Sequence, residues 1–89
     1  MTIRGFLEDQ REAARGELRG AAGNLGRVGA INGRISLIDW LLDGADELTP
    51  DQFVQALSDA AAGRRPVPGM LHPAQASDLL QRWEALVQG

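Results

Sequence analysis

The sequence contains no cysteine, no tyrosine and no lysine, and all nine of its basic residues are arginine. Without cysteine the chain can form neither a disulfide nor a thiolate zinc site, and these are the usual devices that stabilise very small domains. The one histidine, His72, is too few for a histidine-rich metal site. No nucleophile with a nearby base and no phosphate-binding loop can be recognised. We therefore expect no metal, no cofactor and no enzyme activity.

Long apolar runs are also missing. The longest apolar stretch, residues 37–42, is interrupted by Asp39 and is far shorter than the ~18 residues that a membrane span needs. Residues 1–15 carry three acids as well as three arginines and lack the apolar segment of a secretory signal. We expect a cytoplasmic protein without membrane contact. The use of arginine without lysine, with abundant alanine and glycine, favours a GC-rich gene of bacterial or phage origin.

The 89 residues allow one small domain, which we expect to span residues 1–89. A chain of this length buries little more than ~60% of its extended surface, so its hydrophobic core barely outweighs the loss of conformational entropy. A domain with no disulfide or metal to stabilise it gains from assembly with a copy or a partner. We therefore expect a homo-oligomer or a complex with another protein.

Apolar periodicity predicts four helical segments and no strand, which indicates an all-α bundle of three to four helices with short glycine and proline turns. The segments run from Thr2 to about residue 22, from about 26–30 to 43, from Thr49 to Gly63, and from Pro73 to about Gln88. The apolar face of the first segment is predicted to extend to Leu25. Gly23-Asn24 is the best stop signal between the first two segments, although one continuous helix remains an alternative.

The third segment has the clearest start. Thr49 is a predicted N-cap, Pro50 occupies the first helical position, and Gln52 completes a capping box. After this segment, Pro68-Gly69 suits a type II turn.

The second segment is apolar around most of its circumference, with Ile31, Ile35 and Ile38 on one side and Leu37 and Trp40 on another. Such a helix is central either to the fold or to an assembly. We expect Trp83, which lies in the middle of the last apolar stripe, in the core. Trp40 is also expected in the core, with a partner-binding anchor as the alternative because tryptophan is frequent at interfaces.

Charge is distributed unevenly along the chain, whose net charge is −3. Residues 1–34 carry six arginines and four acids, and residues 64–89 carry three arginines and two acids. Residues 35–63 carry six acids and no base. Since complementary charge steers association, this central segment suits a basic protein surface. Its acids do not match a calcium-binding loop, in which only Asp43 would occupy a ligand position.

Two further features have a functional and a structural interpretation. Arg64-Arg65 in a loop can bind a phosphate or a carboxylate, or can pair with the central acids. Gly16 and Gly20 have the spacing that lets two helices approach closely, although they can also be glycines with no packing role.

We interpret the chain as a non-catalytic protein-interaction module, either an accessory subunit or an inhibitor of a larger protein, that is expected to be oligomeric. The predicted partner-binding residues are Asp39, Trp40, Asp43, Asp46, Glu47, Arg64 and Arg65. The predicted oligomer interface consists of Gly16, Gly20 and Leu37.

Two alternatives stay open. A small DNA-binding regulator would need Arg4, Arg11, Arg15 and Arg19 to form one basic strip, but these residues do not share a helical face. The net negative charge also argues against nucleic acid. A bundle that binds a small ligand is the other alternative.

Overall fold

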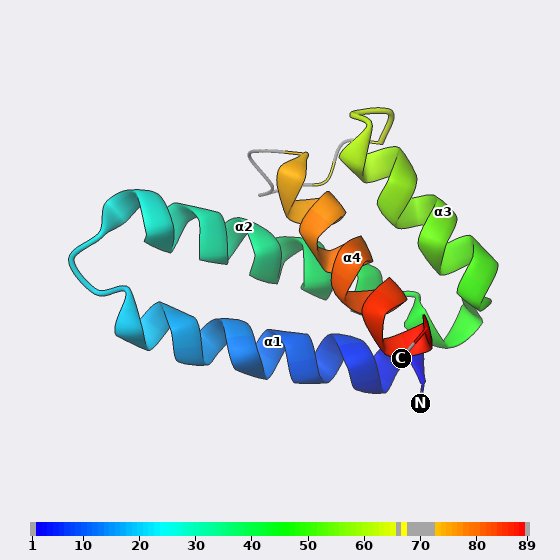
Figure 1. The fold of residues 1–89 in the computed structure, drawn as a ribbon, viewed down its shortest axis with the longest axis horizontal. Coiled ribbons are helices and arrows are strands. Elements are labelled where there is room, and N and C mark those ends of the chain that lie inside the picture. Colours follow the sequence, from blue (N-terminus) through cyan, green and yellow to red (C-terminus); the bar gives the residue numbers. More distant parts are fainter. Residues whose placement is uncertain (1, 66, 68–72, 89) are drawn as a thin grey trace.

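The computed structural model describes residues 2–65, 67 and 73–88, and within them it confirms the expected small all-α bundle (Figure 1). Its four α-helices are α1 (Ile3–Gly20), α2 (Leu25–Leu42), α3 (Pro50–Ala61) and α4 (Ala74–Gln88). A short 3₁₀ helix, η1 (Ala45–Glu47), connects α2 to α3. The predicted turn at Pro68-Gly69, and His72, lie outside the described residues.

Helices α1 and α2 form an antiparallel hairpin that is closed by a turn at residues 21–24 (Figure 1). Gly23 adopts a φ of 93°, a left-handed conformation that glycine tolerates better than other residues. The Asn24 side chain then caps α2 by accepting a hydrogen bond from the backbone N–H of Arg27 at 3.1 Å. The predicted break at Gly23-Asn24 is therefore confirmed, and the two helices are separate.

The predicted start of α3 is also confirmed. The Thr49 hydroxyl accepts a hydrogen bond from the backbone N–H of Gln52 at 3.2 Å, and the Gln52 side chain accepts one from the backbone N–H of Thr49 at 3.0 Å. Such a reciprocal capping box satisfies two backbone donors that the helix itself leaves free.

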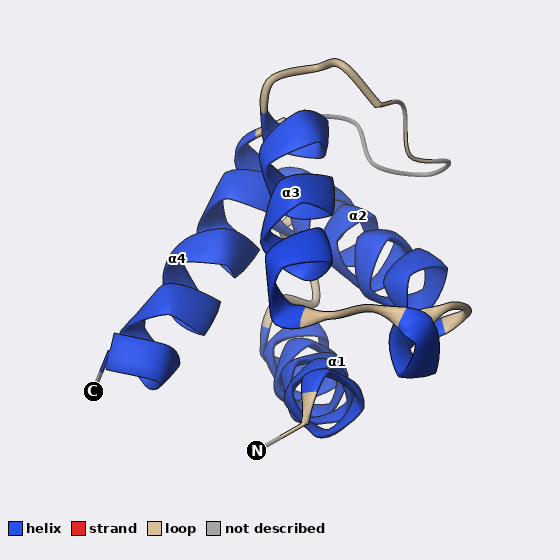
Figure 2. Cartoon of the chain, turned by 90° about the vertical axis from the view of Figure 1, so that its right-hand side faces the viewer, coloured by secondary structure: helices blue, strands red, loops and turns tan. Residues whose placement is uncertain are grey.

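The main core lies where α3 and α4 pack over one end of the hairpin (Figure 2). Three aromatic rings from three helices meet edge to face there, because Trp83 lies 5.1 Å from Phe6 and 5.1 Å from Phe53. Each such pair contributes about 0.5–1.5 kcal/mol beyond its buried area. The predicted core position of Trp83 is confirmed.

The other half of the hairpin extends beyond α3 and α4 (Figure 1) and has a separate, smaller core. Three buried residues form it, Ala14, Ala21 and Ile31, with partly buried Leu18, Val28 and Ile35 around them. Leu25 was predicted on the apolar face of the first helix, and that prediction is wrong. Because α1 ends at Gly20, Leu25 begins α2 at the tip of the hairpin, where it is 86% exposed.

Candidate functional site

An open groove lies between the C-terminal end of α2, η1 and α3. It consists of two adjoining hollows of about 280 and 470 Å³. Both hollows are lined by Gly44, Leu48, Ala56 and Arg65; Trp40 and Leu41 extend the apolar lining on one side. We call this feature the Trp40 groove.

Within this groove the guanidinium of Arg65 lies over the Trp40 ring, 5.6 Å from its centroid. The turn after α3 holds Arg65 in place. Gly63 has a φ of 76°, and the backbone N–H groups of Arg64 and Arg65 both donate to the Asp59 carbonyl, at 2.9 and 3.3 Å. Arg65 itself is exposed, and Trp40 is partly buried. The face of the indole is therefore covered by a cation that the chain itself supplies.

The four predicted acidic residues divide into two pairs. Asp46 forms an ion pair with Arg4 at 2.8 Å, and Asp39 forms one with Arg11 at 3.3 Å, so both acids are neutralised by α1. The hydrogen bond from Arg4 lowers the pKa of Asp46 below its usual range.

Asp43 and Glu47 form the other pair of acids. Both are exposed, both line the Trp40 groove, and neither forms an ion pair with any described residue. Although they are four residues apart in the sequence, they do not share a helical face, because α2 ends at Leu42. The structure thus brings Trp40, Asp43, Glu47 and Arg65 together.

The groove also contains an acid that the sequence analysis did not select. The Asp59 carboxylate accepts hydrogen bonds from the Gln55 amide at 2.9 Å and from Arg64 at 3.1 Å. Both hydrogen bonds lower the pKa of Asp59 below its usual value, and the bond from Gln55 has the larger effect. Arg64 is therefore an ion-pair partner of Asp59. The spacing of Gln55 and Asp59, four residues apart on α3, was the available signal.

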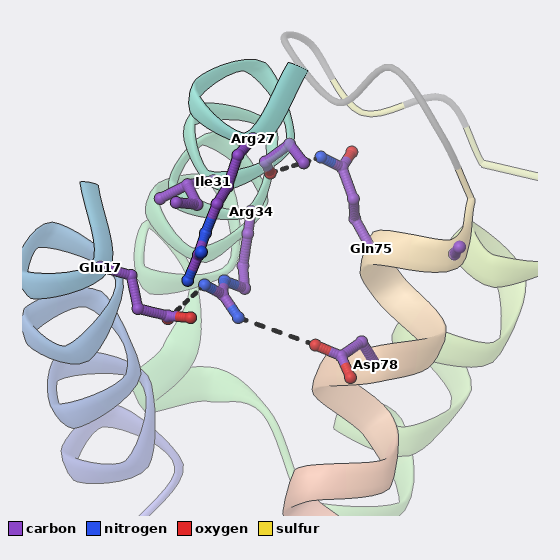
Figure 3. A pocket seen from close by; sticks show the side chains of 8 residues that line it. Glu17, Arg27, Ile31, Arg34, Gln75 and Asp78 are labelled. Carbon is purple, nitrogen blue, oxygen red and sulfur yellow. Dashed lines mark hydrogen bonds and ion pairs between the residues drawn. The ribbon is translucent and has the colours of Figure 1, made fainter. Parts of the chain in front are cut away.

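A second hollow, of about 290 Å³, opens where α1, α2 and α4 meet, and we call it the Arg34 pocket (Figure 3). Arg34 is only 8% exposed. Its Nη2 donates a hydrogen bond to Glu17 of α1, and its Nη1 lies 3.7 Å from Asp78 of α4, beyond hydrogen-bond distance. Its buried Nε has no hydrogen-bond partner. This guanidinium therefore uses few of its five N–H donors.

Gln75 attaches α4 to α2 on the same side of the pocket. Its amide nitrogen donates to the Ala30 carbonyl at 2.6 Å. A Cβ atom on Gly33 would lie 2.2 Å from that nitrogen, so only glycine leaves room for the side chain. This close approach accounts for a glycine in the interior of α2.

Arg27 lies at the mouth of the Arg34 pocket, and its side chain extends along that of Arg34 (Figure 3). It is exposed and forms no ion pair with the described residues. Arg82 of α4 joins the network through Asp78, at 3.4 Å, and donates to the Gln10 side chain at 3.1 Å.

The Arg34 pocket was not among the sites predicted from the sequence. One signal was present, because on a helical wheel Arg34 falls between Leu41 and Ile38, within the apolar part of its helix. A charged residue at such a position has to find partners from other helices. Which helices supply them depends on the tertiary arrangement, which the spacing of residues does not encode.

The predicted oligomer interface is not assembled as one surface. Leu37 is 0% exposed in the main core, so its side chain has no surface to offer to a second chain. A Cβ atom on Gly20 would meet nothing within 4 Å, and one on Gly16 would meet only the Arg19 side chain. No helix of the described chain packs closely on these two glycines.

Among the described residues, no helix is long and apolar enough to cross a membrane, and no group of acidic or histidine side chains is arranged to hold a metal ion. No known protein family, curated protein or solved structure matches the chain.

Proposed function

We propose that this chain is a non-catalytic protein-interaction module whose Trp40 groove binds a cationic, partly apolar segment of a protein. The observation that carries the proposal is the position of Arg65 over Trp40, in the groove that also contains Asp43 and Glu47, two acids without an ion pair among the described residues. The chain's own arginine occupies the place that a partner's cation would take.

The energetics favour exchange of Arg65 for a partner's side chain. A cation over an exposed aromatic ring contributes only about 0.5–1 kcal/mol, so the intramolecular contact is easily replaced. A partner that covers the groove would exclude water from the contact between its own cation and the Trp40 ring, and this would strengthen that contact. Tryptophan is a frequent anchor of interfaces, and the two unpaired acids would raise the rate of encounter with a basic surface.

A role as an oligomeric, cytoplasmic accessory subunit or inhibitor is consistent with such a surface. The DNA-binding alternative loses support, because Arg4 and Arg11 are occupied by Asp46 and Asp39. Only Arg15 and Arg19 of the four arginines in α1 remain without an ion pair among the described residues, and two cations make a weak phosphate-binding strip.

Photo-crosslinking in the cells that carry the gene tests the proposal. A benzoylphenylalanine at Gln55, an exposed residue of the groove, should yield a discrete protein adduct. The double variant Asp43→Arg/Glu47→Arg should lose the adduct, and the same crosslinker at exposed Glu84 of α4 should not form it. The proposal is wrong if position 55 yields no adduct, or if the adduct persists after charge reversal.

A second candidate function is the binding of a small anionic ligand in the Arg34 pocket. The observation that favours it is the pair of arginines, since Arg34 has unused donors and Arg27 has no ion pair among the described residues. Two arginines and two acids, Glu17 and Asp78, line the pocket, and Arg82, which lies outside the lining, also pairs with Asp78. Guanidinium groups suit carboxylates and phosphates.

Titration with sodium phosphate tests this second candidate. We expect it to shift the NMR signals of the Arg27 and Arg34 side chains, whereas sodium chloride at equal ionic strength leaves them in place. Arg27→Ala should abolish the phosphate response. Equal responses to the two salts would rule out a specific anion site.

A further inference from the structure

We infer that the segment that fills the Trp40 groove is the tip of the α1–α2 hairpin of a second copy of this chain. The inference rests on the proposed function, because it names the occupant of the same groove. Its basis is the complementarity of two surfaces: the hairpin tip is cationic with an exposed apolar side chain, and the groove carries acids beside a hollow with apolar side chains.

The tip is cationic and carries an exposed apolar side chain. Leu25 begins α2 and has 86% of its surface exposed. Arg19 lies one residue before the end of α1, and Arg27 is the third residue of α2, so both lie within one turn of the connection. Both arginines are exposed and have no ion pair among the described residues.

The only acid near the tip is already neutralised. Residues 13–30 carry three arginines and a single acid, Glu17. Glu17 forms an ion pair with Arg34 of α2. The positive charge of the tip therefore has no counterpart within its own half of the hairpin.

The Trp40 groove has the complementary features. Its hollow of about 280 Å³ has a mixed lining whose apolar part includes Trp40, Leu41 and Leu48, and it is large enough for a leucine side chain. Asp43 lines this hollow and Glu47 lines the adjoining one, both without ion pairs among the described residues and in a stretch of the sequence that contains no base. Leu25 would enter the hollow while Arg19 approaches these two acids, and Arg27 would join it by turning its side chain out of the Arg34 pocket.

The positions of the tip and the groove determine the kind of assembly. The molecule is 38 Å long, and the turn at residues 21–24 lies at the opposite end from η1 and the start of α3 (Figure 1). A tip therefore cannot reach the groove of its own chain. Contacts between two different surfaces join copies head to tail, and these form a ring if they close and a chain if they do not.

Light scattering over a concentration series, up to about 1 mM for a weak contact, tests the inference. We expect the mass of the wild-type protein to rise with concentration and to fall again in 0.5 M salt, because exposed charge pairs are screened. Two variants should stay monomeric: Leu25→Asp, which alters the tip, and Asp43→Arg/Glu47→Arg, which alters the groove.

Mixing the two variants separates a head-to-tail contact from a symmetric one. The Leu25→Asp chain keeps an intact groove, and the Asp43→Arg/Glu47→Arg chain keeps an intact tip. An equimolar mixture should therefore give a dimer and nothing larger. A mixture that stays monomeric, although the wild-type protein assembles, would overturn the head-to-tail arrangement.

Matched controls come from α4. Val87→Asp introduces the same charge at another exposed apolar residue, and Glu84→Arg reverses another exposed acid. Both should assemble like the wild-type protein, and their circular dichroism should match that of the tip and groove variants. Loss of assembly in either control would mean that the contact lies elsewhere.

The inference and the proposed function can fail separately. A wild-type protein that stays monomeric across the series, together with a crosslinked adduct of a different protein at position 55, overturns the inference and leaves the proposed function standing. Without either self-association or an adduct, both fail.

Discussion

Among the described residues, Arg34 has the one buried side-chain nitrogen, Nε, that lacks a hydrogen-bond partner. Its side chain is 9% exposed, whereas those of its partners Glu17 and Asp78 are 37% and 50% exposed. The two acids stay largely hydrated if the arginine is removed, whereas the mostly buried arginine loses its hydrogen-bond acceptor if Glu17 is removed. The cost of breaking this ion pair therefore depends on which partner is replaced.

Glu17→Ala should destabilise the protein by about 1–3 kcal/mol, because a buried charged donor loses its hydrogen bond. Arg34→Met should cost less than about 1 kcal/mol, because an apolar side chain of similar length can replace a buried charge. Urea denaturation measures both, with Glu12→Ala at an exposed position of α1 as the control. A larger loss for Arg34→Met than for Glu17→Ala would contradict this explanation.

Substitution of glycine by alanine should have opposite effects on stability at Gly33 and at Gly29. Gly29→Ala should stabilise α2 by about 0.5–1 kcal/mol, since a Cβ atom there meets nothing and alanine favours a helix. Gly33→Ala should offset that gain by displacing Gln75, whose lost hydrogen bond to Ala30 costs about 1–3 kcal/mol. We expect a net destabilisation in thermal and urea unfolding.

The double variant provides the control for this pair. In a Gln75→Ala protein no amide has to move, so Gly33→Ala should become as favourable as Gly29→Ala. If Gly33→Ala remains destabilising in that background, its cost does not come from Gln75.

Asp46 should make a pH-dependent contribution to the stability of the folded protein. The hydrogen bond from Arg4 lowers its pKa in the folded protein below the ordinary value of 3.8. The folded state thus holds the proton less tightly than the unfolded state, so the contribution is present above pH 3.8 and is lost as the pH falls through the folded pKa. Arg4→Gln should be less stable than the wild-type protein at pH 6, and the gap should shrink progressively as the pH falls below 3.8.

The control for this pH dependence is Arg15→Gln, at an arginine with no ion pair among the described residues. Its stability relative to the wild-type protein should not change across the same range. A gap between Arg4→Gln and the wild-type protein that persists in acid would show that Arg4 acts by packing and not through the charge of Asp46.

At the scale of the element, the two halves of the hairpin differ in how they are held. The half near the chain's N-terminus packs under α3 and α4, whereas the half with the tip has only the small cluster around Ala14, Ala21 and Ile31. Gly26 and Gly29 further weaken this part of α2, since each lowers helix propensity relative to alanine.

Native-state hydrogen exchange should reveal this difference. Backbone amides of residues 26–32 should exchange at least about tenfold faster than those of residues 36–42, because opening the tip disrupts fewer buried contacts. Gly29→Ala should slow exchange at the tip without changing the end near Leu42. Uniform protection along α2 would contradict the division of the hairpin into two parts.

The helices themselves were largely predictable from the sequence. Thr49, Pro50 and Gln52 specify the start of α3 through contacts within one turn, and Gly23-Asn24 separates α1 from α2 in the same local way. Such signals need no knowledge of the rest of the fold. The position of Leu25 was not predicted, because the periodic pattern of α1 continues in sequence beyond the residue at which the helix ends.

At the scale of the whole molecule, charge along the sequence did not predict charge in space. The central acids were expected to act together, but α1 neutralises Asp39 and Asp46 and leaves Asp43 and Glu47 in the groove. The contact of Arg65 with Trp40 joins residues 25 positions apart through a turn whose direction only the fold determines. Composition identified the acidic segment, and the tertiary structure selected its available part.

The proposed contact can be observed most directly through the indole N–H signals of the two tryptophans, recorded by NMR in a concentration series. Trp40 lies in the groove, and Trp83 lies in the core and serves as an internal control. If a second copy fills the groove, the Trp40 signal should shift with concentration and return in 0.5 M salt, while the Trp83 signal stays in place. A Trp40 signal that does not move while the mass of the protein rises would show that the groove is not the contact surface.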